Sequence, residues 1–367
     1  MKRTERRIRK LLRNKRNQYW DDNAKLLEQA VHGRSIIKES ASGNQLLTGQ
    51  QVRQLDNKTL TTSEEETVAR WIQHFTLLFN QPGEIGPEIE SKIPEQQPQQ
   101  ESIKTGPFSD LELSQAIKCM QNDKSEGPDG VAVEIDKYAA GIEARGTLLQ
   151  IFNSILESGN VPANLKDVII TVLHKGKGNK EDCNNYRGIS LMSHRGKILE
   201  RLILNRLKPA LEYIVPNNQF GFSEGVGTAD AIMISRVVGV SAEKEHSGLV
   251  RCYVDLTKAY DKVNRATLWR LLRIYGIPEE LINVIMSLHE GAIAKLRLNG
   301  ITTPEEIKLQ RGLKQGSVLS PVLFNIFMGA IIKSFEKTCT IEVGQVAEEI
   351  GIKVSYNLAG DLLDQKR

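Results

Sequence analysis

The sequence predicts an α+β fold, on three observations. Apolar residues recur at helical spacing in the stretches that follow Thr62, Ser109 and Lys197. Short apolar runs bounded by turn residues, such as residues 166–173, predict strands. The helical and strand patterns do not alternate regularly, which favours α+β over a doubly wound α/β sheet.

Length and composition limit the class of protein. The chain has 367 residues, of which 40% are hydrophobic and 26% charged, enough for two or three domains with a sizeable core. Its most apolar stretch, residues 318–332, is shorter than the ~20 residues of a membrane span and predicts a buried helix. No apolar run follows the basic N-terminus, and the four cysteines are isolated. We therefore expect an intracellular protein of the nucleus or cytoplasm, with no signal peptide, membrane span, disulfide framework or cysteine metal site.

Residues 1–81 predict a basic helical pre-domain region. Residues 1–16 hold nine Lys and Arg against one Glu, whereas the whole chain carries a net charge of only +4. This basic arm could bind phosphates, act as a nuclear address, or simply be a solvated helix face. A second helix begins at Thr62, which forms a capping box with Glu65. Its apolar stripe predicts a packing face and comprises Val68, Trp71, Phe75, Leu78 and Phe79.

Residues 82–106 predict a linker. Four prolines are mixed there with glutamates and a glutamine-rich run. That composition cannot bury a core. A globular domain is expected over residues 107–367.

The elements expected in this domain follow in order. Ser109 and Glu112 form a capping box, and residues 127–130 form a turn. The pattern then predicts a strand at 166–173, a loop through Arg187, a helix at 197–211 and a strand at 249–256.

The rest of the pattern predicts two helices, a pair of strands and the apolar helix. Asn264 caps a helix that stops at Gly276, and Pro278 opens the next. Strands are expected at 294–298 and 307–309, with Asn299-Gly300 giving the first a turn. Ser320 and Pro321 are predicted to cap and begin the apolar helix.

The predicted strand at 249–256 carries the first site of chemical interest. Alternation would turn Val250, Cys252, Val254 and Leu256 to the core. Asp255 would then lie on the polar face at the strand's carboxyl end, where a carboxylate can meet a metal ion. A turn-forming or capping aspartate is the alternative.

Two further loops carry polar groups suited to a ligand. In residues 313–317, Gly316 permits close approach of the backbone, and Gln315 offers a donor and an acceptor. In the loop after the first strand, flexible cations and glycines suit a polyphosphate. The loop's cations are Lys175, Lys177, Lys180 and Arg187. An ordinary connection and a solvated loop are the alternatives.

Taken together, the blocks of this sequence resemble reverse transcriptases of non-LTR retrotransposons (long interspersed elements). The first catalytic motif of that family is similar to YVDLTKAYDKV at 253–263, and the second to GLKQGSVLSPVLF at 312–324. The other blocks that agree in order and spacing are 71–80, KSEGPDG at 124–130, NYRGISL at 185–191, KILE at 197–200, NRL at 205–207 and QFGF at 219–222. The resemblance covers nearly the whole chain, most strongly residues 107–330.

The resemblance implies the fingers and palm of a right-hand polymerase, which performs two-metal nucleotidyl transfer to a primer 3′-end. It implies that Asp255 and the Leu256 carbonyl bind two Mg²⁺ ions, which lie about 4 Å apart in such sites. Tyr260 would lie under the incoming sugar and exclude a 2′-hydroxyl. The implied partners are an RNA template, a DNA primer and dNTPs.

The resemblance also assigns the nucleotide contacts. Lys175 and Arg187 would hold the triphosphate, with Lys177 as the alternative if the loop is shifted. Gln315 and Gly316 would contact nucleotide and template.

The sequence departs from the family pattern at two places. Ser223 and Val226 stand where the family usually has Arg or Lys, which should weaken nucleic-acid contact. The third catalytic motif, with two adjacent aspartates, is not found. The segment 358–364 could be a decayed copy of that motif. Alternatively, it is part of 352–364, which resembles the segment that precedes the motif in the family, and more positions agree with this second interpretation. We therefore expect a fragment without the second metal-binding carboxylate, thumb or endonuclease, and inactive by itself.

Two other interpretations remain open. The chain could be a non-catalytic RNA-binding remnant that uses the basic arm and the fingers. It could also be an unstable translation of a degenerate element.

Overall fold

A computed structural model of the chain describes residues 51–54, 59–80, 102–139, 141–216, 218–244, 246, 249, 251 and 253–333. All of them belong to the second of two units, Gly49–Arg367. The basic arm, residues 82–101 of the predicted linker and the segment 352–364 lie outside the described residues. The predicted domain boundaries therefore stay predictions.

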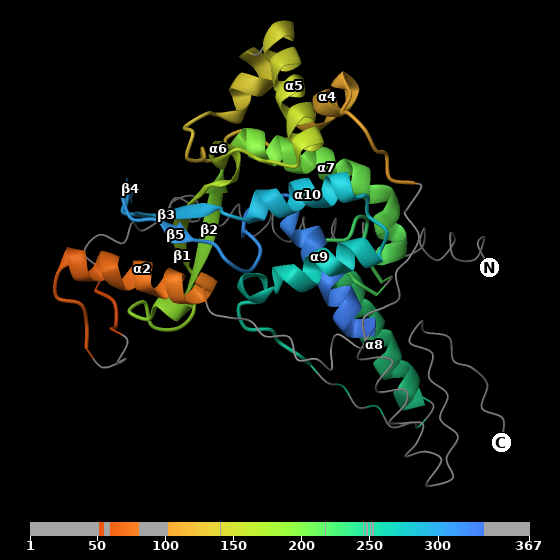
Figure 1. Cartoon of the computed structure of the whole chain (residues 1–367). Coiled ribbons are helices and arrows are strands. Elements are labelled where there is room, and N and C mark those ends of the chain that lie inside the picture. Colours follow the sequence, from red (N-terminus) through yellow and green to blue (C-terminus); the bar gives the residue numbers. More distant parts are fainter. Residues whose placement is uncertain are drawn as a thin grey trace, which may run out of the picture. The chain divides into compact units, whose positions relative to one another are not determined.

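A five-stranded mixed sheet forms the centre of this unit (Figure 1). Its order is β2-β1-β3-β4, and β5 pairs with β3. β1 pairs antiparallel with β2 and parallel with β3. The bounds are β1 Val168–His174, β2 Tyr186–Met192, β3 Ile293–Leu298, β4 Ile301–Thr302 and β5 Ile307–Lys308. The strands predicted at 166–173, 294–298 and 307–309 are confirmed to within about two residues.

The Asn299-Gly300 turn is also confirmed, because it joins β3 to β4. Its two residues have φ angles of 52° and 80°. Two positive φ values in a row suit the right-handed twist of a hairpin, and Asn and Gly adopt them most easily.

Helices pack against the sheet and against one another. α7 contacts α4 and α6, and α10 contacts α5 and α9, whereas α2 packs on β5 (Figure 1). The helices are α2 Glu64–Asn80, α4 Asp110–Lys118, α5 Ile142–Ser158, α6 Ala163–Lys166, α7 His194–Ile214, α8 Thr228–Lys244, α9 Arg265–Ile274 and α10 Glu279–His289. Residues 320–333 are also helical. Short turns of other helix types are Ile135–Ala139, Cys183–Asn185 and Tyr260–Lys262.

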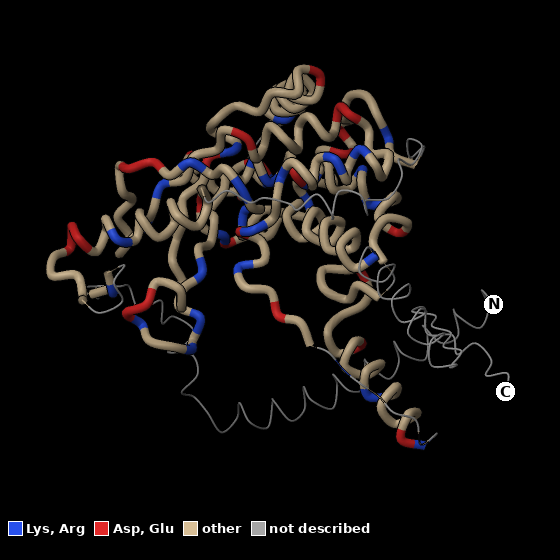
Figure 2. Tube along the Cα trace, turned by 60° about the horizontal axis from the view of Figure 1, so that its bottom comes forward, with Lys and Arg blue, Asp and Glu red and all other residues tan. Residues whose placement is uncertain are grey.

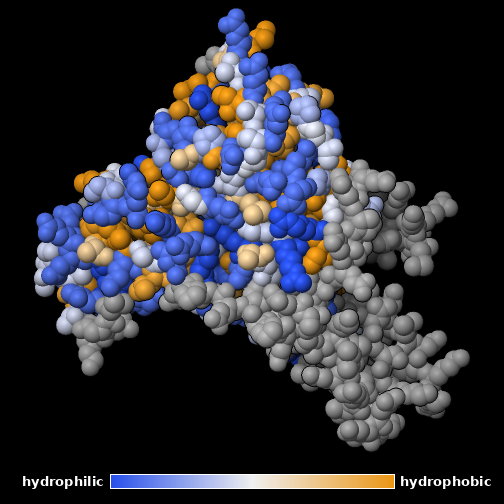
Figure 3. Space-filling view, in the orientation of Figure 1, coloured by the Kyte–Doolittle hydropathy of each residue, from blue (hydrophilic) through white to orange (hydrophobic). Residues whose placement is uncertain are grey.

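The main hydrophobic core lies where α7 meets α4, α5, α9, α10 and the helix over residues 320–333. α7 is the most buried helix, and Ile198, Leu199 and Leu207 are fully buried in it. Fully burying such side chains contributes about 1.5–3 kcal/mol each. The core confirms the apolar patterns of these segments. Figure 3 shows that some apolar side chains stay at the surface over the upper helices, where α5 exposes Ile142.

Several predicted helix caps are confirmed. Ser109 and Glu112 form the reciprocal capping box of α4. Asn264 accepts a hydrogen bond of 3.0 Å from the backbone N–H of Thr267 and so caps α9. Pro278 directly precedes α10.

The predicted start of α2 is wrong by one residue. Ser63, not Thr62, accepts the bond from the backbone N–H of Glu66, at 3.1 Å. The Glu66 carboxylate accepts the Thr62 backbone N–H at 2.7 Å. The sequence offers three overlapping Ser/Thr-x-x-Glu patterns, which start at Thr61, Thr62 and Ser63, and the last of them begins the helix.

The predicted strand at 249–256 is wrong. No described residue of this segment is in a strand, and Val250 and Cys252 lie outside the description. Val254 and Leu256, expected in the core, are 79% and 47% exposed. A strand needs a hydrogen-bonded neighbour, and no described strand pairs with this segment.

Two smaller boundaries also differ. Arg187 lies on β2 and not in the preceding loop. Ser320 is the first residue of its helix, because Ser317 makes the capping bonds, accepting the backbone N–H groups of Leu319 and Ser320 at 3.1 and 3.2 Å. In the described part of the chain, no helix is long and apolar enough to cross a membrane.

Candidate active site

The segments 253–263 and 312–324 lie against each other. The backbone N–H of Leu313 donates to the Tyr260 carbonyl at 2.9 Å, and that of Gly312 donates to the Val263 carbonyl at 3.0 Å. These two bonds run between residues about fifty positions apart. The structure therefore joins the end of the first motif to the second.

The Asp261 side chain fixes the orientation of Gln315. The Gln315 amide nitrogen donates to both Asp261 carboxylate oxygens, at 3.0 and 3.1 Å. Asp261 is only 6% exposed, and this burial raises the pKa of its carboxyl despite the opposing bond from Gln315. Sequence reasoning missed Asp261; its place inside the quoted motif, directly after Tyr260, was the available signal.

The Tyr260 ring is held between the two motifs. It stacks on Phe324, with ring centroids 4.8 Å apart and planes inclined by 13°. Phe222 meets it edge-on at 6.3 Å. The Tyr260 hydroxyl is buried with no hydrogen-bond partner, and burial raises its pKa to about 12. The ring is therefore positioned by packing.

Gly316 lies where no other residue fits. Its φ is +130°, and a Cβ at this position would come within 2.5 Å of the Ser190 carbonyl oxygen. The carbonyl of the neighbouring Gln315 accepts the Ser190 backbone N–H at 2.7 Å. Gly316 thus brings the second motif directly against β2.

Two buried ionisable side chains, Lys314 and Glu200, support this loop. The Lys314 ammonium is buried and donates to the carbonyls of Lys166 and Leu288, at 2.7 and 2.6 Å. Burial lowers its pKa to about 8, while the charge of Glu200 acts to raise it. Glu200 is fully buried and accepts the Ser317 hydroxyl at 2.9 Å and the Val318 N–H at 2.7 Å. Sequence reasoning missed both residues, although both lie inside quoted motifs.

Arg265 holds the approach to the same loop. Its buried guanidinium donates to four carbonyl groups, which belong to Gly312, His289, Leu309 and Arg311. Burial lowers its pKa to about 10. One side chain therefore connects the start of α9 to the end of α10 and to residues 309–312.

The predicted cationic loop lies beside the first motif. The Lys175 ammonium donates to the Asn184 carbonyl at 2.6 Å, and Lys258 donates to the Asn184 side chain at 3.1 Å. Arg187 lies on β2 opposite Leu173 and is exposed, as is Lys177. Figure 2 shows the Lys and Arg positions of this loop in blue.

Asp255 is the predicted residue that the structure does not bring to this cluster. Its side chain is exposed and has no hydrogen bond or ion pair with another described residue. No group of three or more His, Cys, Asp or Glu side chains suited to a metal gathers in the described part of the chain. Mg²⁺ at nucleotide sites takes one or two carboxylates together with phosphates and water. Asp255 fits one ligand of such a site, and the described residues do not complete it.

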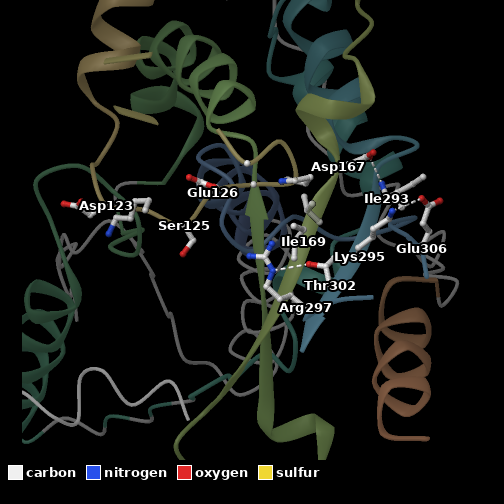
Figure 4. Close-up of a pocket in the computed structure, with 15 residues that line it drawn as sticks. Asp123, Ser125, Glu126, Asp167, Ile169, Ile293, Lys295, Arg297, Thr302 and Glu306 are labelled. Carbon is white, nitrogen blue, oxygen red and sulfur yellow. Dashed lines mark hydrogen bonds and ion pairs between the residues drawn. The ribbon is translucent and has the colours of Figure 1, made fainter. Parts of the chain in front are cut away.

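A cavity with a volume of about 770 Å³ lies elsewhere, between residues 123–130 and the sheet (Figure 4). Its lining carries both signs of charge. Lys295 pairs with Glu306 at 3.6 Å, and Asp167 accepts the backbone N–H of Ile293 at 2.9 Å. This mixture selects no class of ligand.

The lead-in block at 124–130 is attached to the start of α7. The Ser193 hydroxyl donates to the Asp129 carboxylate at 2.6 Å. A Cβ on Gly127 would come within 2.3 Å of the Ser193 nitrogen, so only glycine fits there. In this structure the block positions a helix.

The chain matches a known family of domains. Residues 176–354 match the family described as reverse transcriptase (RNA-dependent DNA polymerase). This range contains both motifs, the helix α7 and most of the loop after β1.

Curated relatives agree with this family. The chain is 35% identical over 188 residues to the RNA-directed DNA polymerase from mobile element jockey of Drosophila melanogaster, covering 49% of this chain and 20% of that protein. It is 30% identical over 236 residues to the probable RNA-directed DNA polymerase from transposon BS of the same species, covering 63% and 25%.

A third relative is the Pol polyprotein from a type-2 retrotransposable element of Drosophila melanogaster, 29% identical over 223 residues, covering 60% of this chain and 20% of that protein. The chain thus matches a fifth to a quarter of the length of these relatives. Residues 176–354 are thus similar to a reverse transcriptase domain, and the relatives are RNA-directed DNA polymerases of non-LTR retrotransposons.

Proposed function

We propose that this domain supplies fingers and palm elements of an RNA-directed DNA polymerase, which extends a DNA primer on an RNA template with dNTPs. The observation that carries the proposal is the joining of the two motifs by the Asp261–Gln315 bonds. A polymerase must hold the sugar and base of a nucleotide in one place relative to the primer end. The two motifs provide one rigid surface for that purpose.

Tyr260 and Gln315 are proposed as the residues that select the nucleotide. The Tyr260 ring has little freedom, because Phe324 covers one face and Phe222 meets its edge. A ring fixed in this way can exclude a 2′-hydroxyl by contact alone. Asp261 holds the Gln315 amide, and Gln315 and Gly316 are proposed to contact nucleotide and template.

Lys175 and Arg187 are proposed to hold the triphosphate, with Lys177 as the alternative. They lie at the loop end of the β1–β2 hairpin, where Leu173 lies opposite Arg187. Lysine and arginine form strong charge-assisted bonds to phosphate. Arg187 and Lys177 are exposed and so accessible to a nucleotide, whereas Lys175 is half-buried and its ammonium donates to the Asn184 carbonyl.

Asp255, with the Leu256 carbonyl, is proposed to supply part of the Mg²⁺ ligand set. When bound, such ions activate the primer hydroxyl and stabilise the leaving pyrophosphate. No adjacent pair of aspartates follows Asp255 in the sequence. We therefore propose that the 367-residue polypeptide by itself synthesises little or no DNA.

Primer extension on an RNA template with Mg²⁺ and dNTPs tests this function in two forms. One is the 367-residue polypeptide; the other is a fusion in which the matching downstream segment of the jockey polymerase replaces residues 352–367. We expect DNA synthesis only by the fusion. Asp255→Ala in the fusion should abolish this synthesis. Gln315→Ala should weaken the use of dNTPs, so that a higher dNTP concentration is needed for the same rate. Robust DNA synthesis by the unfused polypeptide, abolished by Asp255→Ala, would contradict the proposal that this polypeptide is inactive by itself. A folded fusion that neither binds template–primer nor extends it would contradict the function.

The exposed, unbonded Asp255 favours a second candidate function, a non-catalytic RNA-binding remnant. That function predicts RNA binding that weakens as the salt concentration rises and after removal of residues 1–16. Asp255→Ala should leave this binding unchanged. Filter binding of RNA at several salt concentrations measures both effects. An RNA affinity that changes neither with salt concentration nor after removal of residues 1–16 would exclude this second function.

A further inference from the structure

A second pocket opens between α2 and the first motif. Its volume is about 380 Å³. α2 contributes Arg70 and His74, and the chain after Asp255 contributes Lys258 and Lys262. The remaining lining residues are Leu77, Leu78, Asn184, Thr257 and Arg311. The pocket therefore has four cationic side chains and no carboxylate in its lining.

The cations of this pocket are weakly neutralised. Within the described residues, Arg70, Lys258 and Lys262 form no ion pair. Arg70 and Lys258 are half-buried, whereas Lys262 is exposed. The pocket thus concentrates positive charge at a partly desolvated place.

The pKa of His74 is affected by the same positive charges. His74 is 8% exposed, and its pKa is lowered to about 4, first by burial and then by the charges of Lys258 and Arg70. At neutral pH the imidazole is therefore uncharged and can accept or donate one hydrogen bond.

Arg70 has a donor directed to no protein atom. Its Nε donates to the Arg53 carbonyl at 3.0 Å, which fixes the guanidinium. One terminal nitrogen of the same group is buried and has no hydrogen-bond partner. A buried donor without a partner costs about 1–3 kcal/mol.

We propose that this pocket binds a phosphate group, supplied by the backbone of a nucleic-acid strand or by a free polyphosphate. Phosphate offers several strong acceptor oxygens and the negative charge that the pocket lacks. Arg70, Lys258 and Lys262 are the residues that recognise it, and Asn184 holds the Lys258 ammonium in place. The pocket's lining does not include Lys175 or Arg187. The proposal concerns binding alone, so its outcome does not depend on polymerase activity.

Isothermal titration calorimetry of the full 367-residue chain tests the pocket with two probes, inorganic pyrophosphate and a 12-nucleotide single-stranded RNA. Arg70→Gln and Lys262→Gln remove one pocket cation each, and Lys262 is exposed without a bond that the fold needs. Arg236→Gln on α8 and Lys118→Gln on α4 are matched controls, because both side chains are exposed and outside the pocket. Thermal unfolding of each variant checks that it is folded.

We expect each pocket variant to weaken binding about tenfold, as loss of one charge-assisted bond does, and the controls to change it less than twofold. A loss seen with both probes identifies a general phosphate site. A loss confined to RNA identifies the strand as the source, and a loss confined to pyrophosphate identifies the free anion. If Lys262→Gln and Arg70→Gln bind both probes as the controls do, or if neither probe binds the folded chain, the proposal is wrong.

Discussion

Strand β3 and the segment 249–256 have similar sequence patterns and different structures. Both alternate apolar and polar residues over six to eight positions. In β3, Ala294 and Leu296 are fully buried, and the strand lies between β1 on one side and β4 and β5 on the other. In the other segment, Val254 is 79% exposed and no described strand lies beside it. Alternation therefore predicts which face a strand would bury, and a hydrogen-bonded neighbour decides whether the strand forms.

The largest expected effect concerns the contact of the second motif with β2. Through this contact residues 312–317 have a neighbouring strand, which residues 249–256 lack among the described strands. Gly316→Ala places a Cβ against the Ser190 carbonyl at a φ of +130°. We expect a loss of about 4 kcal/mol in the free energy of unfolding. Urea unfolding followed by circular dichroism measures it. Gly176→Ala is the matched control, because its φ is also positive but its Cβ would meet no atom; equal losses in both variants would refute the role of the contact.

The comparison itself is tested by shortening one apolar side chain in each segment. Leu296→Ala in β3 leaves a cavity in the core and should cost about 3 kcal/mol. Val254→Ala should change the free energy of unfolding by less than about 0.5 kcal/mol, because the side chain is exposed. Denaturant midpoints of the two variants give the answer. A cost at Val254 close to that at Leu296 would show that 249–256 is packed after all.

A smaller effect is expected at the Glu112–Arg206 pair, which joins α4 to α7 at 2.8 Å. Hydrogen bonds from Arg206 and Ser109 outweigh burial and lower the pKa of Glu112 to about 2, from an ordinary 4.5. The stability that this carboxylate adds is therefore complete above pH 4.5 and is lost as the pH falls from 4.5 to about 2.

Glu112→Gln should cost about 2 kcal/mol at pH 7 and progressively less below pH 4.5. Unfolding curves at pH 7, 4 and 3 measure the difference. Glu143→Gln, at an exposed site on α5, should show no such dependence. A cost that stays constant with pH would contradict the assignment.

The smallest effect is expected at the Tyr260 hydroxyl, which is buried without a partner. Tyr260→Phe keeps the stack on Phe324 and removes an unsatisfied polar atom. We expect the free energy of unfolding to rise by up to about 1 kcal/mol. Thermal unfolding measures it, and a clear loss would mean that the hydroxyl has a partner in solution.

The sequence predicted most elements whose signals are local. The capping box of Ser109, the Asn264 cap and the Asn299-Gly300 turn each depend on residues a few positions apart. The buried strand at 166–173 was also found, because it is apolar on both faces and bounded by turn residues. The start of α2 was missed by one residue because three candidate capping patterns overlap there.

The parts of the site that could not be predicted depend on long-range contacts. The Asp261–Gln315 bonds and the burial of Glu200 and Lys314 arise only when distant segments meet. A spacing pattern in a single chain says nothing about such meetings. The resemblance marked the right blocks without showing what each residue contacts.

The parallel pairing of β1 with β3 also has a consequence for synthesis of the chain. Asp167, at the start of β1, accepts a bond from Ile293, 126 positions further along. At about 5–20 residues per second, a ribosome needs roughly 6–25 s to make the intervening chain. During that time the β1–β2 hairpin has an open edge, which is a ready template for wrong pairing. The late arrival of β3 therefore makes this domain a natural client for chaperones that protect strand edges.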